Sequence, residues 1–131
     1  MGIFQFFLGL RNPTDRSDLE GIWERVGDNF AGCLIQVEWE EGELVGKIIA
    51  MNSEMLLYGW AVGDKKWRHI EGDAHNGWHL MDLRKQYDTA SKKVLSIDYA
   101  RYWMSIGLSG RLRLHQSKIP LFAAQFWKKV H

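Results

Sequence analysis

Apolar and polar residues alternate with a period of two over most of the chain after residue 20, and this period is typical of half-buried β-strands. The clearest run spans residues 33–40, where CLIQVEWE places an apolar side chain at every second position. Glu41-Gly42 then predicts a tight hairpin turn. Residues 43–51 return as the partner strand, with a bulge or bend expected at Gly46.

The same pattern predicts further strands over residues 21–28, 56–62, 65–71, 77–84, 94–99, 101–106, 107–115 and 119–130. The last of these also permits a short helix after Pro120, and the polar stretch 85–93 is expected to be a loop. Many short strands with regularly spaced turns indicate an all-β sandwich or barrel. Seven tryptophans and the lack of paired cysteines favour the barrel.

We therefore expect an all-β fold, an antiparallel up-and-down β-barrel of about eight to ten strands. The barrel domain would occupy residues 19–131, after an N-terminal arm over residues 1–18 that contains a helical turn at Asp15 to Leu19. The arm begins MGIFQFFLGL, which lacks the basic start and the cleavage site of a signal peptide. We expect it to pack on the domain; the alternatives are weak association with a membrane interface or with a second copy.

The chain has 131 residues, which fits one domain, and a single cysteine, Cys33, which excludes an internal disulfide. Both the lone cysteine and the absence of a signal peptide predict a cytoplasmic location. Cys33 opens an apolar run, so we interpret it as a buried thiol rather than as a nucleophile.

Charge is distributed unevenly along the chain. Residues 1–83 hold 14 acidic and 7 basic residues, whereas residues 84–131 hold 2 acidic and 10 basic residues. Such asymmetry can indicate an anionic partner. We favour the simpler interpretation, in which acidic and basic strands become solvated neighbours when the barrel closes.

Two segments resemble the calycin superfamily, which includes the lipocalins. Gly21-Ile22-Trp23 follows a short turn, as does the Gly-x-Trp motif on the first strand of those barrels. Asp98 and Tyr99 lie in a segment similar to the lipocalin strand that ends in Thr-Asp-Tyr, although Ile97 stands where Thr is usual. The lipocalin pattern also has a late-strand arginine across the motif tryptophan, a role open to Arg111 or Arg113.

The resemblance implies a barrel whose interior holds one small apolar or amphipathic molecule. Trp23 would close one end as core. If Arg111 or Arg113 faces inward, it would orient an anionic end of the ligand. Strand alternation favours the opposite orientation, in which the leucines face the interior and the arginines face solvent. The expected ligand walls are Val37, Trp39, Ile48, Tyr58, Trp60, Met81, Tyr102 and Met104.

The competing hypothesis is an interaction module whose barrel is filled by its own side chains. Such a module would bind a protein, a membrane or a nucleic acid through its surface. We do not expect nucleic acid, because Arg101 and Tyr102 are adjacent on a strand and point opposite ways.

Motifs for catalysis and for metal binding are weak. Asp82 and Asp98 lie in otherwise apolar strands, where a buried carboxylate could do acid–base work, but such residues more often face solvent. If their hairpin pairs His69 with His79, both imidazoles would share one face and could bind a metal or haem. The simpler interpretation is that both are ordinary polar residues on strands. We therefore expect no catalytic residues, no metal and no cofactor.

Overall fold

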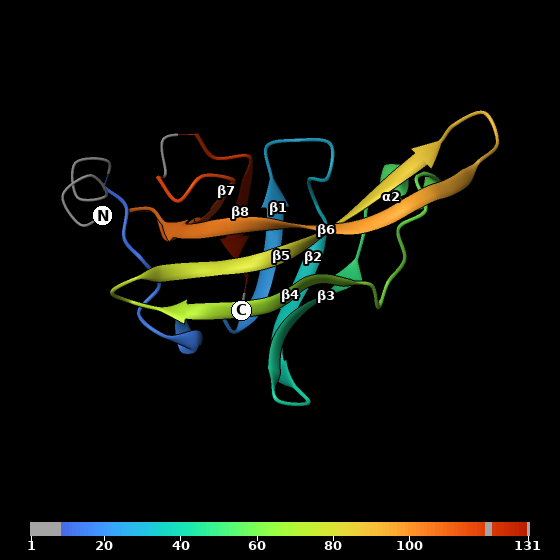
Figure 1. The fold of residues 1–131 in the computed structure, drawn as a ribbon. Helices are drawn as coiled ribbons and strands as arrows, with labels where there is room; N and C mark the ends of the chain where they lie inside the picture. The colour runs from blue at the N-terminus through green and yellow to red at the C-terminus, as the bar shows by residue number, and fades with distance from the viewer. Residues whose placement is uncertain (1–8, 120–121, 131) are drawn as a thin grey trace.

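The computed structural model describes residues 9–119 and 122–130. Its eight strands follow one another around a closed antiparallel barrel (Figure 1). Each strand pairs with the next along the chain, and the last pairs with the first, so the expected all-β up-and-down barrel is confirmed. In order, the elements are the 3₁₀ turn η1 (Arg16–Asp18), β1 (Gly21–Val26), β2 (Leu34–Glu40), β3 (Glu43–Ala50), α2 (Ser53–Leu57), β4 (Lys65–Asp73), β5 (Gly77–Asp88), β6 (Lys93–Ile106), β7 (Leu112–His115) and β8 (Gln125–Lys129).

Local sequence explains the first hairpin. Glu41 and Gly42 both adopt positive φ, at 50° and 80°, which matches the twist that a two-residue turn needs between antiparallel strands. The predicted irregularity at Gly46 is also present, because the β3–β4 register shifts between Gly46 and Lys47. The predicted helical turn at Asp15 to Leu19 is η1, where the Asp15 carboxylate accepts a hydrogen bond from the backbone N–H of Ser17.

The prediction of a strand over residues 56–62 is wrong. Asn52 accepts a hydrogen bond from the backbone N–H of Met55, and this cap starts the helical turn α2 instead. Gly59, inside the predicted strand, adopts a φ of 83°, which lies outside the β region. The segment crosses from β3 to β4 with only Met55 of α2 buried.

The predicted loop over residues 85–93 is too long, since only residues 89–92 lie outside the strands. β5 continues to Asp88, and residues 94–99 and 101–106 form one long strand, β6, rather than two. The two strands extend together beyond the rest of the barrel as a ribbon beside α2 (Figure 1). One face of this ribbon is polar: Arg84 makes two hydrogen bonds to Asp98, and Ser96 donates to Gln86.

Large aromatic side chains fill the middle of the barrel. Trp23, Trp67 and Trp127 are almost completely buried. The rings of Trp67 and Trp127 meet edge to face, with their centroids 4.9 Å apart. Two close contacts leave no room for a side chain at Gly46, since a Cβ there would lie 2.8 Å from Ile35 and 2.9 Å from Trp67. The centre of the barrel is therefore occupied by the chain itself.

Part of the expected N-terminal arm, residues 1–8, lies outside the described residues. The rest joins the barrel: Leu10 is buried, and Arg11 forms an isolated antiparallel bridge with Ile106. Among the described residues, none of the helical segments is long and apolar enough to cross a membrane.

Candidate functional site

Five of the expected ligand-wall residues lie in the hydrophobic core. Val37, Ile48, Trp60, Tyr102 and Met104 are all buried among other core side chains. Strand register explains their placement, since Met104 and Tyr102 stand opposite Trp78 and Leu80 on neighbouring β5.

The other expected wall residues lie apart from these five. Met81 pairs across the ladders with Arg68 and Arg101, on the face of β5 opposite to buried Leu80 and Asp82. Tyr58 is partly exposed after α2 and contacts Tyr87 edge to face. Trp39, at the end of β2, is 55% exposed.

Arg111 and Arg113 lie outside the barrel. Leu112 and Leu114 are fully buried, so alternation along β7 turns the two arginines to the outer face. The guanidinium of Arg113 lies 5.4 Å from the ring centre of Phe126.

The residues that carry the calycin resemblance occupy definite structural positions. Trp23 donates a 2.8 Å hydrogen bond from Nε1 to the carbonyl of Leu19, and Gly21 adopts a φ of 128°. The cation above the Trp23 ring is Lys129 of β8, at 5.5 Å, whereas Arg111 lines a cavity beside Trp23. Asp98 is exposed and bonded to Arg84, and Tyr99 donates to the carbonyl of Lys65.

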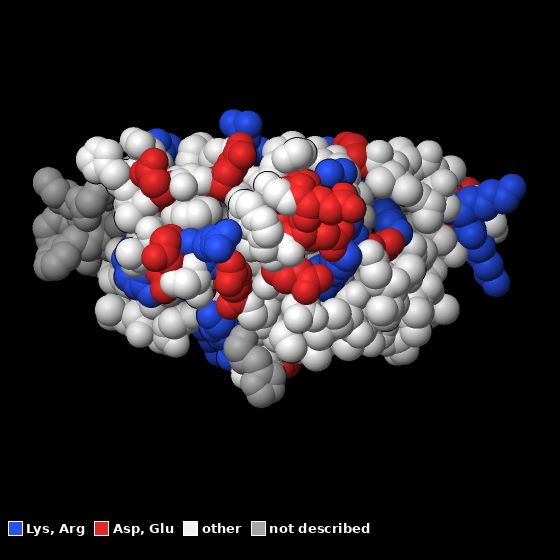
Figure 2. Space-filling model, turned by 90° about the horizontal axis from the view of Figure 1, so that it is seen from below, with Lys and Arg blue, Asp and Glu red and all other residues white. Residues whose placement is uncertain are grey.

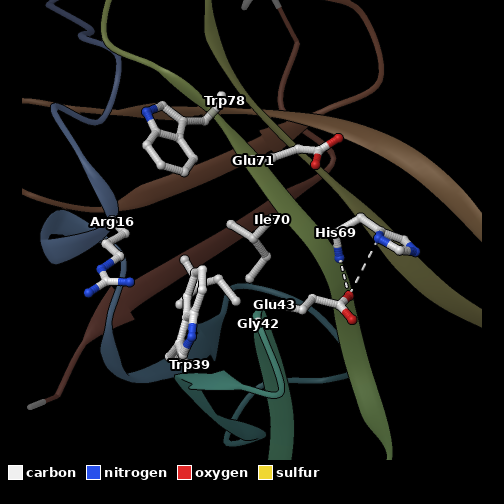
Figure 3. A pocket seen from close by; sticks show the side chains of 10 residues that line it. Arg16, Trp39, Gly42, Glu43, His69, Ile70, Glu71 and Trp78 are labelled. Carbon is white, nitrogen blue, oxygen red and sulfur yellow. Dashed lines mark hydrogen bonds and ion pairs between the residues drawn. The ribbon is translucent and has the colours of Figure 1, made fainter.

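A cavity of about 430 Å³ lies at the end of the barrel that holds the β2–β3 and β4–β5 turns (Figure 3). We call it the hairpin pocket. The β2–β3 turn, the end of β4 and the start of β5 supply most of its wall, and η1 adds one side chain. The lining residues are Arg16, Trp39, Gly42, Glu43, Leu44, His69, Ile70, Glu71, Gly72 and Trp78.

Two indoles form the aromatic walls of the hairpin pocket. Figure 3 shows Trp78 and Trp39 on opposite sides, with Ile70 between them. The guanidinium of Arg16 lies 4.7 Å from the Trp39 ring centre, a cation–π distance. Trp78 is only 7% exposed, and its Nε1 has no hydrogen-bond partner among the described residues.

Carboxylates lie at the opposite end of the pocket from Arg16 (Figure 3). Glu43 accepts hydrogen bonds from the backbone N–H of His69, at 2.8 Å, and from the guanidinium of Arg68, at 3.2 Å. Burial raises the pKa of Glu43, but these hydrogen bonds outweigh it and hold the pKa below its usual value. Glu71 is also in the wall, 4.0 Å from His79. Figure 2 shows acidic side chains gathered on the face toward which the β2–β3 hairpin turns.

A second group of polar residues lies inside the barrel. Lys66 donates to the Asp82 carboxylate at 2.7 Å and to the Leu83 carbonyl at 2.8 Å. Gln125 donates to the other oxygen of Asp82 and accepts from Trp127 Nε1. Desolvation lowers the pKa of Lys66 because its ammonium is removed from water.

A β-bulge puts Lys66 inside. On β3, Gly46 and Lys47 are adjacent, but their partners on β4 are Trp67 and Lys65, so Lys66 is the extra residue. Lys66 and Trp67 are consequently both buried, although neighbours on a regular strand point opposite ways. Of the two aspartates expected as acid–base candidates, Asp82 is buried in this network and Asp98 is exposed.

The described histidines and Cys33 do not come together as a metal centre. Glu71, not His69, stands opposite His79 across the β4–β5 ladder. Within the described ranges, no three His, Cys, Asp or Glu side chains come together in a manner that could hold a metal ion. Cys33 is buried, and desolvation raises the pKa of its thiol to about 11.

The sequence prediction named Trp39 but missed the rest of the hairpin pocket. Trp39 and Trp78 each lie next to a turn of their hairpins, and both turns fall at the same end of an up-and-down barrel. That pairing of aromatics near two turns was the available signal. Arg16 and Ile70 carried no comparable signal, because their position depends on how η1 and the end of β4 fold back over the barrel.

Searches against family models, curated proteins and solved structures found no match to this chain.

Proposed function

We propose that this protein binds a small amphipathic molecule, without converting it, and that the hairpin pocket is the site. The observation that carries the proposal is the placement of two indoles, Trp39 and Trp78, on opposite sides of one cavity that has Arg16 at one end and carboxylates at the other. A volume of about 430 Å³ lies in the range of small-molecule sites. Its wall combines the two indoles and Ile70 with charged side chains at both ends, which suits a ligand with apolar and polar parts.

The distribution of polar groups suggests how a ligand would lie. Arg16 borders one end of the pocket, whereas Glu43 and Glu71 border the other. A ligand with a planar apolar body would rest between Trp39 and Trp78. Its acceptor group would face Arg16, and a donor or cationic group would face Glu71.

We further propose that the chain is a calycin-like barrel. The support is the up-and-down order of eight strands, the short turn before β1 and the buried tryptophan of Gly21-Ile22-Trp23. A carrier of that kind would hold its ligand in the lumen. In this chain Trp67 and Trp127 occupy the lumen, so the proposed ligand lies at one end of the barrel instead.

The filled lumen also favours a second candidate, an interaction module that acts through its surface. The two candidates differ in whether the purified protein binds small molecules at all. Native mass spectrometry followed by denaturing extraction tests first for a co-purified molecule.

Two-dimensional NMR of the seven tryptophan indoles, during titration with a library of aromatic fragments, then locates the site. The Trp78 signal is assigned by its loss in Trp78→Phe, which removes the donor and keeps an aromatic ring. We expect fragment binding to shift the Trp39 and Trp78 signals and to weaken about tenfold in Trp39→Ala, which removes one aromatic wall. Tyr58→Ala is the control. Tyr58 is an exposed aromatic residue that does not line the pocket, so this variant should bind the fragments as wild type does. Binding that is unchanged in Trp39→Ala would reject the hairpin pocket as the site.

A further inference from the structure

A separate cavity of about 340 Å³ lies between the loop that joins β6 to β7 and the end of β8. Four basic side chains line it: Arg11, Arg111, Lys128 and Lys129. We call it the basic cleft. Trp23 and the Ser109–Gly110 turn complete much of the wall.

The positive charge of the basic cleft is only partly balanced. Asp18 lies 3.0 Å from Arg11, and Glu24 lies 3.8 Å from Lys128. Within the described residues, Arg111 and Lys129 have no ion-pair partner; Lys129 lies over the Trp23 ring instead. Two cations therefore remain available in a recess that Arg11, Lys128 and one carboxylate, Asp18, also line.

The β6–β7 loop gives the cleft a defined shape. The N–H of Gly107 donates to the Arg111 carbonyl at 3.0 Å, and the N–H of Gly110 donates to the Gly107 carbonyl at 2.9 Å. These bonds close a tight turn that places Ser109 and Arg111 at the same cavity. A hydroxyl donor beside a guanidinium suits an oxyanion with several acceptor oxygens.

We propose that the basic cleft binds the phosphate group of a phosphate monoester. Such a group carries between one and two negative charges near neutral pH and three acceptor oxygens. The Arg111 guanidinium can engage two of those oxygens at once, and Lys129 adds a point charge. A phosphate on a soluble molecule and a phosphate on a lipid headgroup offer the same chemistry.

This site is independent of the function proposed for the hairpin pocket. Arg16 of η1 lines the hairpin pocket, whereas Asp18 of the same turn lines the basic cleft. The first cavity is bordered by carboxylates and the second by cations, so they select ligands of different charge.

The experiment compares wild-type protein with an Arg111→Gln/Lys129→Gln double variant. Lys92→Gln/Lys93→Gln, which removes the same charge from the exposed β5–β6 turn, is the matched control. Phenyl phosphate is titrated by calorimetry at low ionic strength, and sedimentation measures binding to phosphatidylcholine vesicles with and without phosphatidic acid. Circular dichroism checks that each variant is folded.

We expect wild type and control to bind at least one phosphate probe saturably, and the Arg111/Lys129 variant to bind it about tenfold or more weakly. Binding should also weaken as salt is added. Binding of phenyl phosphate identifies a soluble ligand class, whereas binding of phosphatidic acid vesicles alone identifies a headgroup. Saturable binding to neither probe, or equal loss in the control, would overturn the proposal.

Discussion

The Lys66 ammonium lies 2.7 Å from the Asp82 carboxylate in the interior of the barrel, and both side chains are almost completely buried. Each charge compensates the other where water is excluded. Gln125 and the Leu83 carbonyl satisfy further hydrogen bonds of the pair. The arrangement makes each residue dependent on its partner.

Lys66→Met should therefore destabilise the fold by about 3–5 kcal/mol, because it leaves the Asp82 carboxylate buried without a counter-charge. Adding Asp82→Asn should restore part of that loss, since the second change removes the uncompensated charge. Urea denaturation measures both. Arg84→Met, which breaks an exposed ion pair, is the control and should cost no more than about 1 kcal/mol. Equal losses in the single and double variants would show that the charge of Asp82 is not the cause.

Trp23 and Trp39 should respond differently to the same truncation. Trp23→Ala removes a buried indole and its hydrogen bond to Leu19, so we expect a loss of about 3–5 kcal/mol in the free energy of unfolding. Trp39 is 55% exposed and contacts Arg16, so Trp39→Ala should cost less than about 1 kcal/mol. Chemical denaturation of the two variants side by side makes the comparison. Similar losses would contradict the placement of Trp23 as core.

Cys33 should be unreactive in the folded protein. The thiolate is the reactive form, and burial raises the pKa of this thiol to about 11 while also blocking access. At mildly alkaline pH, Ellman's reagent should label Cys33 of the native protein only as fast as the protein unfolds to expose the thiol. In denaturant the reagent should label Cys33 at once. Rapid labelling of the native chain would show that Cys33 is accessible.

Stability should fall as the pH is lowered below about 6.5, the ordinary value for histidine. Desolvation lowers the pKa of His115, whose Nε2 is buried without a partner, while its Nδ1–H donates to the Ser117 carbonyl. Above the ordinary pKa both states are neutral and the full stability is present. Below it the unfolded chain takes up a proton that the folded chain resists, so unfolding is favoured.

His115→Asn keeps a donor for Ser117 and removes the titrating group, so its stability should depend less on pH between 7 and 5 than that of wild type. His79, whose pKa is also lowered by desolvation, contributes in the same direction and remains in both proteins. His75→Asn, in an exposed turn, is the control. Thermal unfolding at several pH values gives the measurement, and parallel curves for wild type and His115→Asn would refute the assignment.

Sequence reasoning succeeded where one face of a strand is buried. The alternation over residues 33–40 and the Glu41-Gly42 turn identified β2 and its hairpin, because burial imposes a period of two. It failed at the end of β5, where Lys85, Gln86 and Asp88 offer no apolar alternation. It also failed at α2, where the side chain of a single residue, Asn52, selects a helical turn over a strand.

The candidate sites were harder to predict than the strands. Simple alternation assigns opposite faces to Lys66 and Trp67, and only the bulge between β3 and β4 brings both inside. His69 adopts a φ of 51° and the β4–β5 register shifts beside it, so His69 and His79 do not share the expected pairing. Such one-residue shifts depend on contacts between strands, which a single sequence does not display.

The pairing of β1 with β8 has a consequence for synthesis of the chain. The final ladder of the barrel joins residues 23–26 to residues 126–129, so the barrel cannot close on the ribosome until Lys129 has emerged. Until then, the edges of β1 and β7 are open to pairing with another chain. A stall or a truncation in the segment between β7 and β8 would therefore leave an open sheet with two unpaired edge strands. Such a species is prone to aggregate and needs chaperones.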